Sequence, residues 1–292
     1  MNRPLALGAP AEFHADRLVD VLIPTRNRPA ELAVTLAGLA AQGGVPGFGV
    51  VVSDQSDGDP AYSHPAAATM VRALRHASHP VLLTRRLPRR GLAEHRAYLL
   101  AASSARYVLN LDDDVWLEPG ALHRLVTAIE ELGCGFVGNG VHGLSYTDDV
   151  RPEAHGHYEE WVGRPVPERV RPGTPEWDRA RVHSAANLLH VTAELALPPG
   201  AWRAYKVSWI GGCVLYDRAK LVDSGGFDFW RRVHEKHQGE DVAAQLAVLA
   251  RHGGAGILPS GAYHLESPTT VTERDVEAWE VVLADEDTPQ PA

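Results

Sequence analysis

Three adjacent carboxylates, Asp112, Asp113 and Asp114, follow an apolar run at residues 107–111 that is typical of a buried strand. Carboxylates this close repel one another unless a cation or a ligand rich in hydrogen-bond donors joins them. Mg²⁺ and Mn²⁺ prefer hard oxygen ligands and commonly hold the phosphates of a bound nucleotide. The run therefore predicts a divalent-metal and nucleotide site, with a solvated acidic turn as the alternative interpretation.

The elements around this run alternate between strands and helices. Apolar runs predict strands at residues 19–23, 49–52, 81–84 and 107–111, and amphipathic patterns predict helices at 29–41, 62–77, 92–103 and 120–132. Continuous apolar strands separated by helices are typical of an α/β fold with a doubly wound, mostly parallel sheet. Ligands of such sheets bind beyond the carboxyl ends of the strands, where Thr25, Asp54 and the three carboxylates lie.

Residues 143–204 interrupt this alternation. They are rich in Pro, His, Trp and Arg and predict an irregular insertion with short helices. Regular structure is expected again at residues 206–216, with a helix at 240–252 and strands at 256–258 and 262–265. We expect an N-terminal extension (1–17), a single domain (18–284) and a flexible tail (285–292).

Composition excludes several classes of protein. The 292 residues are 45% hydrophobic and 22% charged, as in soluble globular proteins, and the net charge of −9 argues against nucleic-acid binding. Two cysteines, without a Cys-x-x-Cys spacing, predict buried thiols in a reducing compartment. No apolar stretch reaches the roughly 18–20 residues that span a bilayer, and residues 1–16 lack a secretory pattern. We therefore expect a cytoplasmic protein; contact with a membrane surface and the oligomeric state are left open.

Two common nucleotide sites are missing from the sequence. A dinucleotide-binding site needs Gly-x-Gly-x-x-Gly after the first strand, but this turn reads Pro-Thr-Arg-Asn-Arg-Pro at 24–29. No phosphate-binding P-loop motif occurs either. Binding of phosphates through a metal ion held by carboxylates remains as the third possibility.

Several motifs occur together in a fixed order. They are Asp-Val-Leu-Ile-Pro-Thr-Arg-Asn-Arg at 20–28, Val-Ser-Asp-Gln-Ser-Asp-Gly at 52–58, Gly-Leu-Ala-Glu-His-Arg at 91–96, Leu-Asp-Asp-Asp at 111–114, Trp-Ile-Gly-Gly-Cys-Val-Leu-Tyr-Asp at 209–217, Gly-Gly-Phe-Asp at 225–228 and Gly-Glu-Asp at 239–241. The ordered set resembles the family 2 glycosyltransferases of the GT-A fold, over roughly residues 18–130 and 206–266. The resemblance implies a nucleotide-binding half at 18–130 and an acceptor and catalytic half at 206–266.

The resemblance implies a binding site for a nucleotide-diphosphate sugar. Pro24, Thr25 and Arg26 would line the pocket for the base and ribose. Asp54 would accept a hydrogen bond from the base or ribose, with capping of a turn as the alternative. Arg96 would reach the diphosphate or the base.

The same resemblance implies an Asp-x-Asp metal site for Mn²⁺ or Mg²⁺. Asp114 would bind the metal, and Asp112 would bind ribose or a metal-bound water. Asp113 is counted with the nucleotide-sugar ligands, although on an extended strand it would point away from its neighbours unless the chain turns. His264 would be a third metal ligand, or alternatively a structural residue.

For catalysis, the resemblance implies that Asp241 deprotonates the acceptor hydroxyl, with Glu240 as the second choice. An acid at the start of a helix is also expected on structural grounds alone. Gly211 and Gly212 would let the backbone approach the donor sugar, or form a bulge. The acceptor site would include Trp209, for which core packing is the alternative, and Asp228, which would position the acceptor or a loop.

The implied function is an inverting, metal-dependent glycosyltransferase with a donor of the UDP or dTDP type. Its acceptor would be a hydroxyl of a saccharide, a lipid-linked saccharide or a small natural product. The alternatives are a retaining transferase and a module that binds a nucleotide sugar or glycan without turnover. The aromatic residues of the insertion suit carbohydrate stacking or a small core, so the acceptor is not identified.

Overall fold

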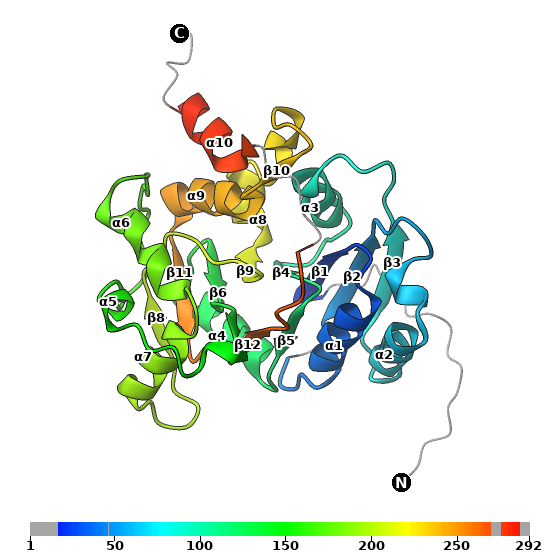
Figure 1. Cartoon of the computed structure of the whole chain (residues 1–292), viewed down its shortest axis with the longest axis horizontal. Helices are drawn as coiled ribbons and strands as arrows, with labels where there is room; N and C mark the ends of the chain where they lie inside the picture. Colours follow the sequence, from blue (N-terminus) through cyan, green and yellow to red (C-terminus); the bar gives the residue numbers. More distant parts are fainter. Residues whose placement is uncertain (1–16, 46, 270–275, 287–292) are drawn as a thin grey trace.

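The computed structural model describes residues 17–45, 47–269 and 276–286, and an eight-stranded sheet runs through its middle (Figure 1). The strand order is β3-β2-β1-β4-β9-β6-β11-β8. The strands are β1 Val19–Thr25, β2 Gly49–Asp54, β3 Val81–Arg85, β4 Tyr107–Leu111, β6 Phe136–Gly138, β8 Arg203–Tyr205, β9 Cys213–Asp217 and β11 Gly254–Leu258. The predicted α/β fold is confirmed.

The first four strands of this sheet are parallel neighbours, as expected. β1 pairs with β2 on one side and with β4 on the other, and β2 pairs with β3. Side chains alternate between the two faces, so that Val21 and Ile23 lie in one buried cluster and Leu22 lies in the other. Both faces are covered, which explains why these strands are continuously apolar.

Helices cover both faces of the sheet. On one face lie α1 (Pro29–Ala40), α2 (Pro65–His76, preceded by the short helix η1, Ala61–Ser63) and α4 (Ala121–Leu132). On the other face lie α3 (Leu92–Ala101), α8 (Arg218–Asp223) and α9 (Glu240–His252). Leu32, Leu36 and Leu39 of α1 are fully buried, in agreement with their helical spacing.

The second half of the sheet is mixed rather than parallel. β9 runs antiparallel to both β4 and β6, and β8 runs antiparallel to β11. The regular structure expected at 206–216 is a strand only from Cys213 to Asp217. Gly212 explains the late start, because its φ of +75° is incompatible with an extended strand.

Two small sheets lie beside the main one. The first, in the order β5-β12-β7, joins β5 (Val115–Leu117), β12 (Ala262–His264) and β7 (His142–Gly143). The second joins β10 (His237–Gln238) to β13 (Val276–Glu277). These short strands hold chain segments that border the carboxyl ends of β1 and β4.

Residues 143–204 form short helices, as predicted, and return to the main sheet through β8. The helices are η2 (Leu144–Tyr146), α5 (Pro152–His155), α6 (Pro175–Asp178), η3 (Arg179–His183) and α7 (Asn187–Leu195). Tyr205 of β8 is fully buried, and Leu188 and Val191 of α7 join the same cluster. The segment therefore packs on the sheet at its edge.

A C-terminal helix was not predicted. α10 (Ala278–Glu286) packs against α9, and its Trp279 ring lies 5.0 Å from that of Trp177. It ends at Glu286, so it includes the first two residues of the segment expected to form a flexible tail. The rest of that tail, and the extension at residues 1–16, lie outside the described residues. None of the helices in the described ranges is long and apolar enough to cross a membrane.

Candidate active site

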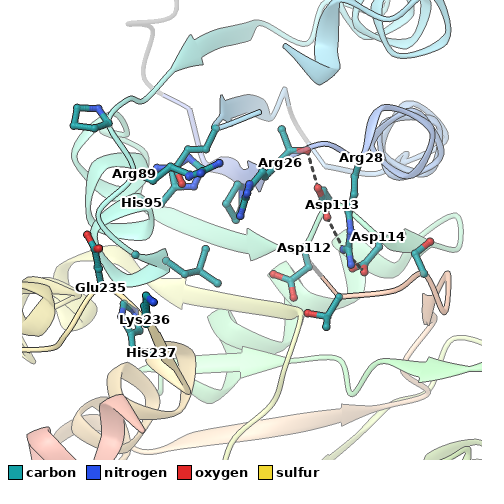
Figure 2. Close-up of a pocket in the computed structure, with 18 of the residues that line it drawn as sticks. Arg26, Arg28, Arg89, His95, Asp112, Asp113, Asp114, Glu235, Lys236 and His237 are labelled. Atoms are coloured by element: carbon teal, nitrogen blue, oxygen red, sulfur yellow. Dashed lines mark hydrogen bonds and ion pairs between the residues drawn. The ribbon is translucent and has the colours of Figure 1, made fainter. Parts of the chain in front are cut away.

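The candidate site lies where the order of the parallel strands reverses. From β1 the chain continues to β2 and β3 on one side, and then to β4 on the other side of β1. Such a reversal leaves a crevice at the carboxyl ends of the two central strands. Here a cavity of about 790 Å³ opens between the turn after β1 and the turn after β4 (Figure 2). Thr25 Oγ1 donates a hydrogen bond to Asp113 Oδ2 at 2.7 Å, which joins the two turns.

The three carboxylates lie on a turn rather than on an extended strand. β4 ends at Leu111, and residues 112–114 bend toward α1. The alternation of side chains therefore fails: Asp113 bonds to Thr25 and Arg28 instead of pointing away from its neighbours, and Figure 2 shows it beside Arg28. Burial, and then the charge of Asp114, raise the pKa of Asp113 to about 7, against the opposing hydrogen bond from Thr25.

Arg28 bridges two of the three carboxylates. Its Nη1 donates to Asp113 Oδ1 at 3.1 Å and to Asp114 Oδ2 at 2.5 Å. Its Nη2 donates to the carbonyl of Pro268. Burial opposes the charge of Arg28, but Asp114 and Asp113 outweigh it and raise the pKa of the guanidinium.

His264 lies beside Asp114, with Nε2 3.4 Å from Asp114 Oδ2. The small sheet produces this proximity, because β12 pairs with β5 so that His264 faces Val115. The hydrogen bond with Asp114 raises the pKa of His264. Burial alone would raise the pKa of Asp114, but hydrogen bonding to His264 and the charges of His264 and Arg28 lower it.

Asp112 pairs with Arg96 instead of standing free. Arg96 Nη2 donates to Asp112 Oδ1 at 2.8 Å, and its Nε donates to Glu240 Oε1 at 2.8 Å. Arg96 is only 4% exposed and does not line the cavity. Arg96 was expected to reach a diphosphate or base. In the structure both edges of its guanidinium are instead bonded to carboxylates.

Asp241 and Glu240 begin α9 and have different surroundings. Glu240 is buried against Arg96, whereas Asp241 is partly exposed, and its Oδ2 lies 3.9 Å from the position that a Cβ on Gly211 would take. Burial, and then the neighbouring charge of Glu240, raise the pKa of Asp241 above its usual range. An acid with a raised pKa accepts a proton more readily, as a general base must.

Gly211 and Gly212 lie between the two groups of carboxylates. A Cβ at Gly212 would lie 3.5 Å from Asp112 Oδ2 and 3.2 Å from Val141 Cγ2. With Asp241 near Gly211, the pair forms a backbone bridge from the turn after β4 to the start of α9. The position of a Cβ on Gly211 is open, with no contact closer than Asp241 Oδ2, whereas that on Gly212 is crowded by Val141 and Asp112.

The remaining predicted ligands divide between the cavity and the scaffold. Pro24, Thr25 and Arg26 line the cavity. Asp54 is fully buried and caps a turn, because its carboxylate accepts from Ser56 N and Ala61 N, both at 2.8 Å. These contacts are those of turn capping, which was the alternative interpretation of Asp54.

The two predicted acceptor residues do not line the cavity. The ring of Trp209 packs 4.7 Å from that of Trp177, which in turn contacts Trp279. This is the core-packing alternative for Trp209. Asp228 lies in the short helix η4 (Asp228–Arg231), is exposed, and pairs with Arg231 at 2.7 Å.

Sequence reasoning missed several residues that line the cavity, namely Arg28, Gln55, Arg89, Lys236 and His237. Arg28 stands in the turn after the first predicted strand, so its position was a usable signal. His237 gave no local signal: it enters the site because its Nε2 accepts the Ala93 N–H of α3 at 3.0 Å.

The side chains that could bind a hard divalent ion form only part of a metal site. Asp114 and His264 are adjacent, but Asp112 turns toward Arg96. Among the residues that the structure describes, no three His, Cys, Asp or Glu side chains converge into a complete metal cage. Mg²⁺ and Mn²⁺ do not need one, because they are often bound by one or two protein ligands together with substrate phosphates.

The mixed sheet, the acidic turn after β4 and the acid pair that begins α9 agree with the GT-A fold that the sequence resemblance implied. Residues 20–181 match the sequence model of Glycosyl transferase family 2, which is more than half of the chain. The chain belongs to this family.

Solved structures of similar fold include two of TarS 1–349 from S. aureus and one of the mannosyltransferase PcManGT from Pyrobaculum calidifontis. TarS in complex with UDP-GlcNAc is 18% identical (TM-score 0.53, covering 91% of this chain and 64% of that chain). Another TarS 1–349 structure is 17% identical (TM-score 0.51, 84% and 60%). PcManGT in complex with GDP-Man and Mn²⁺ is 16% identical (TM-score 0.54, 95% and 67%).

The chain spans less than two thirds of the two TarS chains. At these identities the likeness shows the fold alone. The search of curated proteins found no match.

Proposed function

We propose that this protein transfers a sugar from a nucleotide-diphosphate sugar to an acceptor hydroxyl, with inversion at the anomeric carbon. The observation that carries the proposal is the cavity at the carboxyl ends of β1 and β4. It is lined by Asp112, Asp113 and Asp114 on one side and by Arg26, Arg89 and Lys236 on the other (Figure 2). A site with both signs of charge suits a diphosphate that binds together with a metal.

The nucleotide would occupy the part of the cavity formed by Pro24, Thr25, Arg26 and Gln55. The similar structures bind UDP-GlcNAc and GDP-Man, so they support a nucleotide-sugar donor without selecting its base. Arg89 and Lys236 would contact the negatively charged part of the donor. UDP and dTDP sugars are our first candidates.

Mn²⁺ or Mg²⁺ would be held by Asp114 and His264, with Asp112 near by. When bound, such an ion neutralises the charge that develops on the leaving diphosphate. The Mn²⁺ complex of PcManGT supports the choice of ion. Around it, Thr25 and Arg28 orient the acidic turn through their bonds to Asp113.

Asp241 would act as the base. The acceptor oxygen forms a bond to the anomeric carbon while the bond from that carbon to the diphosphate oxygen breaks, and the hydroxyl proton passes to the Asp241 carboxylate. One displacement from the opposite side inverts the anomeric centre. Gly211, where a Cβ would meet nothing closer than Asp241 Oδ2 at 3.9 Å, would leave space for the sugar beside the base.

Calorimetric titration tests the donor side of this proposal. UDP, dTDP and GDP are titrated into the protein with MnCl₂ and then with EDTA. We expect one nucleotide to bind, with an affinity that falls when EDTA removes the metal. Asp114→Asn should abolish the metal-dependent part, whereas Asp59→Asn, an exposed acid on the turn after β2, should not.

The outcome decides between a transferase and a binding module. If no nucleotide binds the folded protein, the proposal is wrong. If one binds, its sugars are offered with a panel of hydroxyl acceptors, and NMR of the product anomer separates inversion from retention.

A further inference from the structure

One cation of the site stands where a metal would be expected. Arg28 Nη1 contacts one oxygen of Asp113 and one of Asp114, and the Asp114 oxygen that it contacts, Oδ2, is the same oxygen that lies 3.4 Å from His264 Nε2. The guanidinium therefore occupies the face of Asp114 that the adjacent imidazole would share with a metal. Figure 2 shows Arg28 directed at both carboxylates from the start of α1.

We infer that Arg28 is an internal counter-ion that competes with the divalent metal for Asp114. The inference rests on the proposed function, since it concerns the metal of that site. Metal binding requires the guanidinium to leave Asp114 Oδ2, after which Arg28 is free to contact the donor diphosphate. Arg28 is thus a positioning residue that couples occupancy by the metal to occupancy by the donor.

The burial of the carboxylates is the physical reason for such a competitor. The side chains of Asp113 and Asp114 are 8% and 6% exposed, and that of Arg28 is 12% exposed. Buried negative charges without a partner are costly, so the turn needs a cation in every state. Arg28 supplies it when the metal is absent, and two cations on one carboxylate oxygen repel each other when it is present.

The third bond of Arg28 extends the effect to a neighbouring segment. Its Nη2 donates to the carbonyl of Pro268, just after β12, and Ser267 and Thr269 line the cavity. Movement of Arg28 off Asp114 therefore also changes what holds residues 267–269 at the cavity wall.

Apparent affinity falls by the fraction of time that a binding-competent state is populated. If Arg28 holds Asp114 in about 90 to 99 of every 100 molecules, the apparent metal affinity falls by about 10–100-fold. Removing the guanidinium should raise the affinity for the metal by the same factor, even in the absence of nucleotide.

Mn²⁺ binding, followed by the EPR signal of the free ion, tests the inference without any turnover. We expect Arg28→Gln to bind Mn²⁺ about 10–100-fold more tightly than the wild type in the absence of nucleotide. Arg28→Lys, which keeps the charge, should stay within a few-fold of the wild type. Arg86→Gln is the matched control, because Arg86 pairs with the buried Glu94 at 2.6 Å outside the cavity.

Equal Mn²⁺ affinity in Arg28→Gln and the wild type would overturn the inference while leaving the metal site intact. No Mn²⁺ binding in any variant, even with UDP present, would overturn the metal site and the inference together. UDP binding in EDTA then shows separately whether the donor site exists. Should Arg28→Gln not fold, a wild-type crystal structure with Mn²⁺ and UDP decides: Arg28 still bonded to Asp114 Oδ2 beside the bound ion would contradict the inference.

Discussion

Arg96 Nε lies 2.8 Å from Glu240 Oε1, although 144 residues separate the two in the chain. The same guanidinium holds Asp112 Oδ1 at 2.8 Å, so it joins the acidic turn after β4 to the start of α9. Burial opposes its charge, but Asp112, Glu240 and Asp241 raise the pKa of Arg96, which keeps it a cation. One buried side chain thus links the acidic turn after β4 to the two acids that begin α9.

Loss of this guanidinium should destabilise the fold. Arg96→Met leaves Glu240, whose side chain is 5% exposed, without its cation. Breaking a buried ion pair on one side costs about 3–5 kcal/mol, so we expect that decrease in the free energy of unfolding, measured by urea denaturation. Arg231→Gln, which breaks an exposed pair with Asp228, should change it by less than about 0.5 kcal/mol. A decrease for Arg96→Met no larger than for this control would mean that the buried pair contributes little.

Asp241 and Glu240 should differ in their effects on turnover. Asp241→Asn removes the proposed base and should lower kcat by about 10²–10⁴-fold while nucleotide affinity, measured by calorimetry, stays the same. Glu240→Gln should act mainly through Arg96, with a smaller loss of kcat. Asp223→Asn, an exposed acid paired with His252, serves as the control. A larger loss for Glu240→Gln than for Asp241→Asn would assign the base to Glu240.

The pH dependence of kcat should report the environment of Asp241. Burial, and then Glu240, raise its pKa above the usual range for Asp, and a base is active only when deprotonated. Activity should therefore be full above the raised pKa and fall tenfold per pH unit below it. In Glu240→Gln one source of the shift is gone, so the acid limb of the profile should move to lower pH. An acid limb near the ordinary Asp pKa of about 4 in the wild type would contradict this assignment.

Acid should destabilise the protein through His95. This ring is 2% exposed, contacts Ser53 Oγ at 2.8 Å, and has its pKa lowered to about 3 by burial and the charge of Arg96. Between an unfolded pKa of about 6.5 and the folded value, only the unfolded chain takes up this proton. Unfolding free energy should therefore drop by up to about 1.4 kcal/mol per pH unit as pH falls below about 6.

Urea denaturation at several pH values measures this slope in the wild type and in His95→Gln. The substitution keeps a polar partner for Ser53 but cannot take up a proton. If the unfolding free energy of His95→Gln falls between pH 6 and 4.5 as steeply as that of the wild type, His95 does not control the acid response.

The two glycines before β9 should separate folding from catalysis. Gly212→Ala places a side chain at φ +75°, with Val141 Cγ2 only 3.2 Å away, and should cost at least about 1–2 kcal/mol of unfolding free energy. Gly211→Ala meets nothing closer than Asp241 Oδ2 at 3.9 Å and should fold normally. Its methyl group occupies the space next to the proposed base, so kcat should fall although the melting temperature does not. Normal turnover in Gly211→Ala would place the sugar elsewhere.

Local patterns were sufficient for much of the fold. The apolar runs predicted β1 to β4, and the spacing of Leu32, Leu36 and Leu39 predicted α1 with its buried face. These predictions succeed because the buried face of a strand or helix leaves a regular repeat of apolar residues in the local sequence. The acidic turn was visible for the same reason, since its three residues are contiguous.

The sequence by itself thus determined the first four strands with the helices between them, the acidic turn and the family motifs. Only the tertiary structure decided the partners of each polar side chain: Arg96 with Glu240, Arg28 with Asp114, and Asp54 with the turn that follows it. It also decided that β9 runs antiparallel to β4. A buried charged group takes whichever opposite charge the packed elements bring within hydrogen-bond reach, and that depends on distances between segments that no local pattern contains.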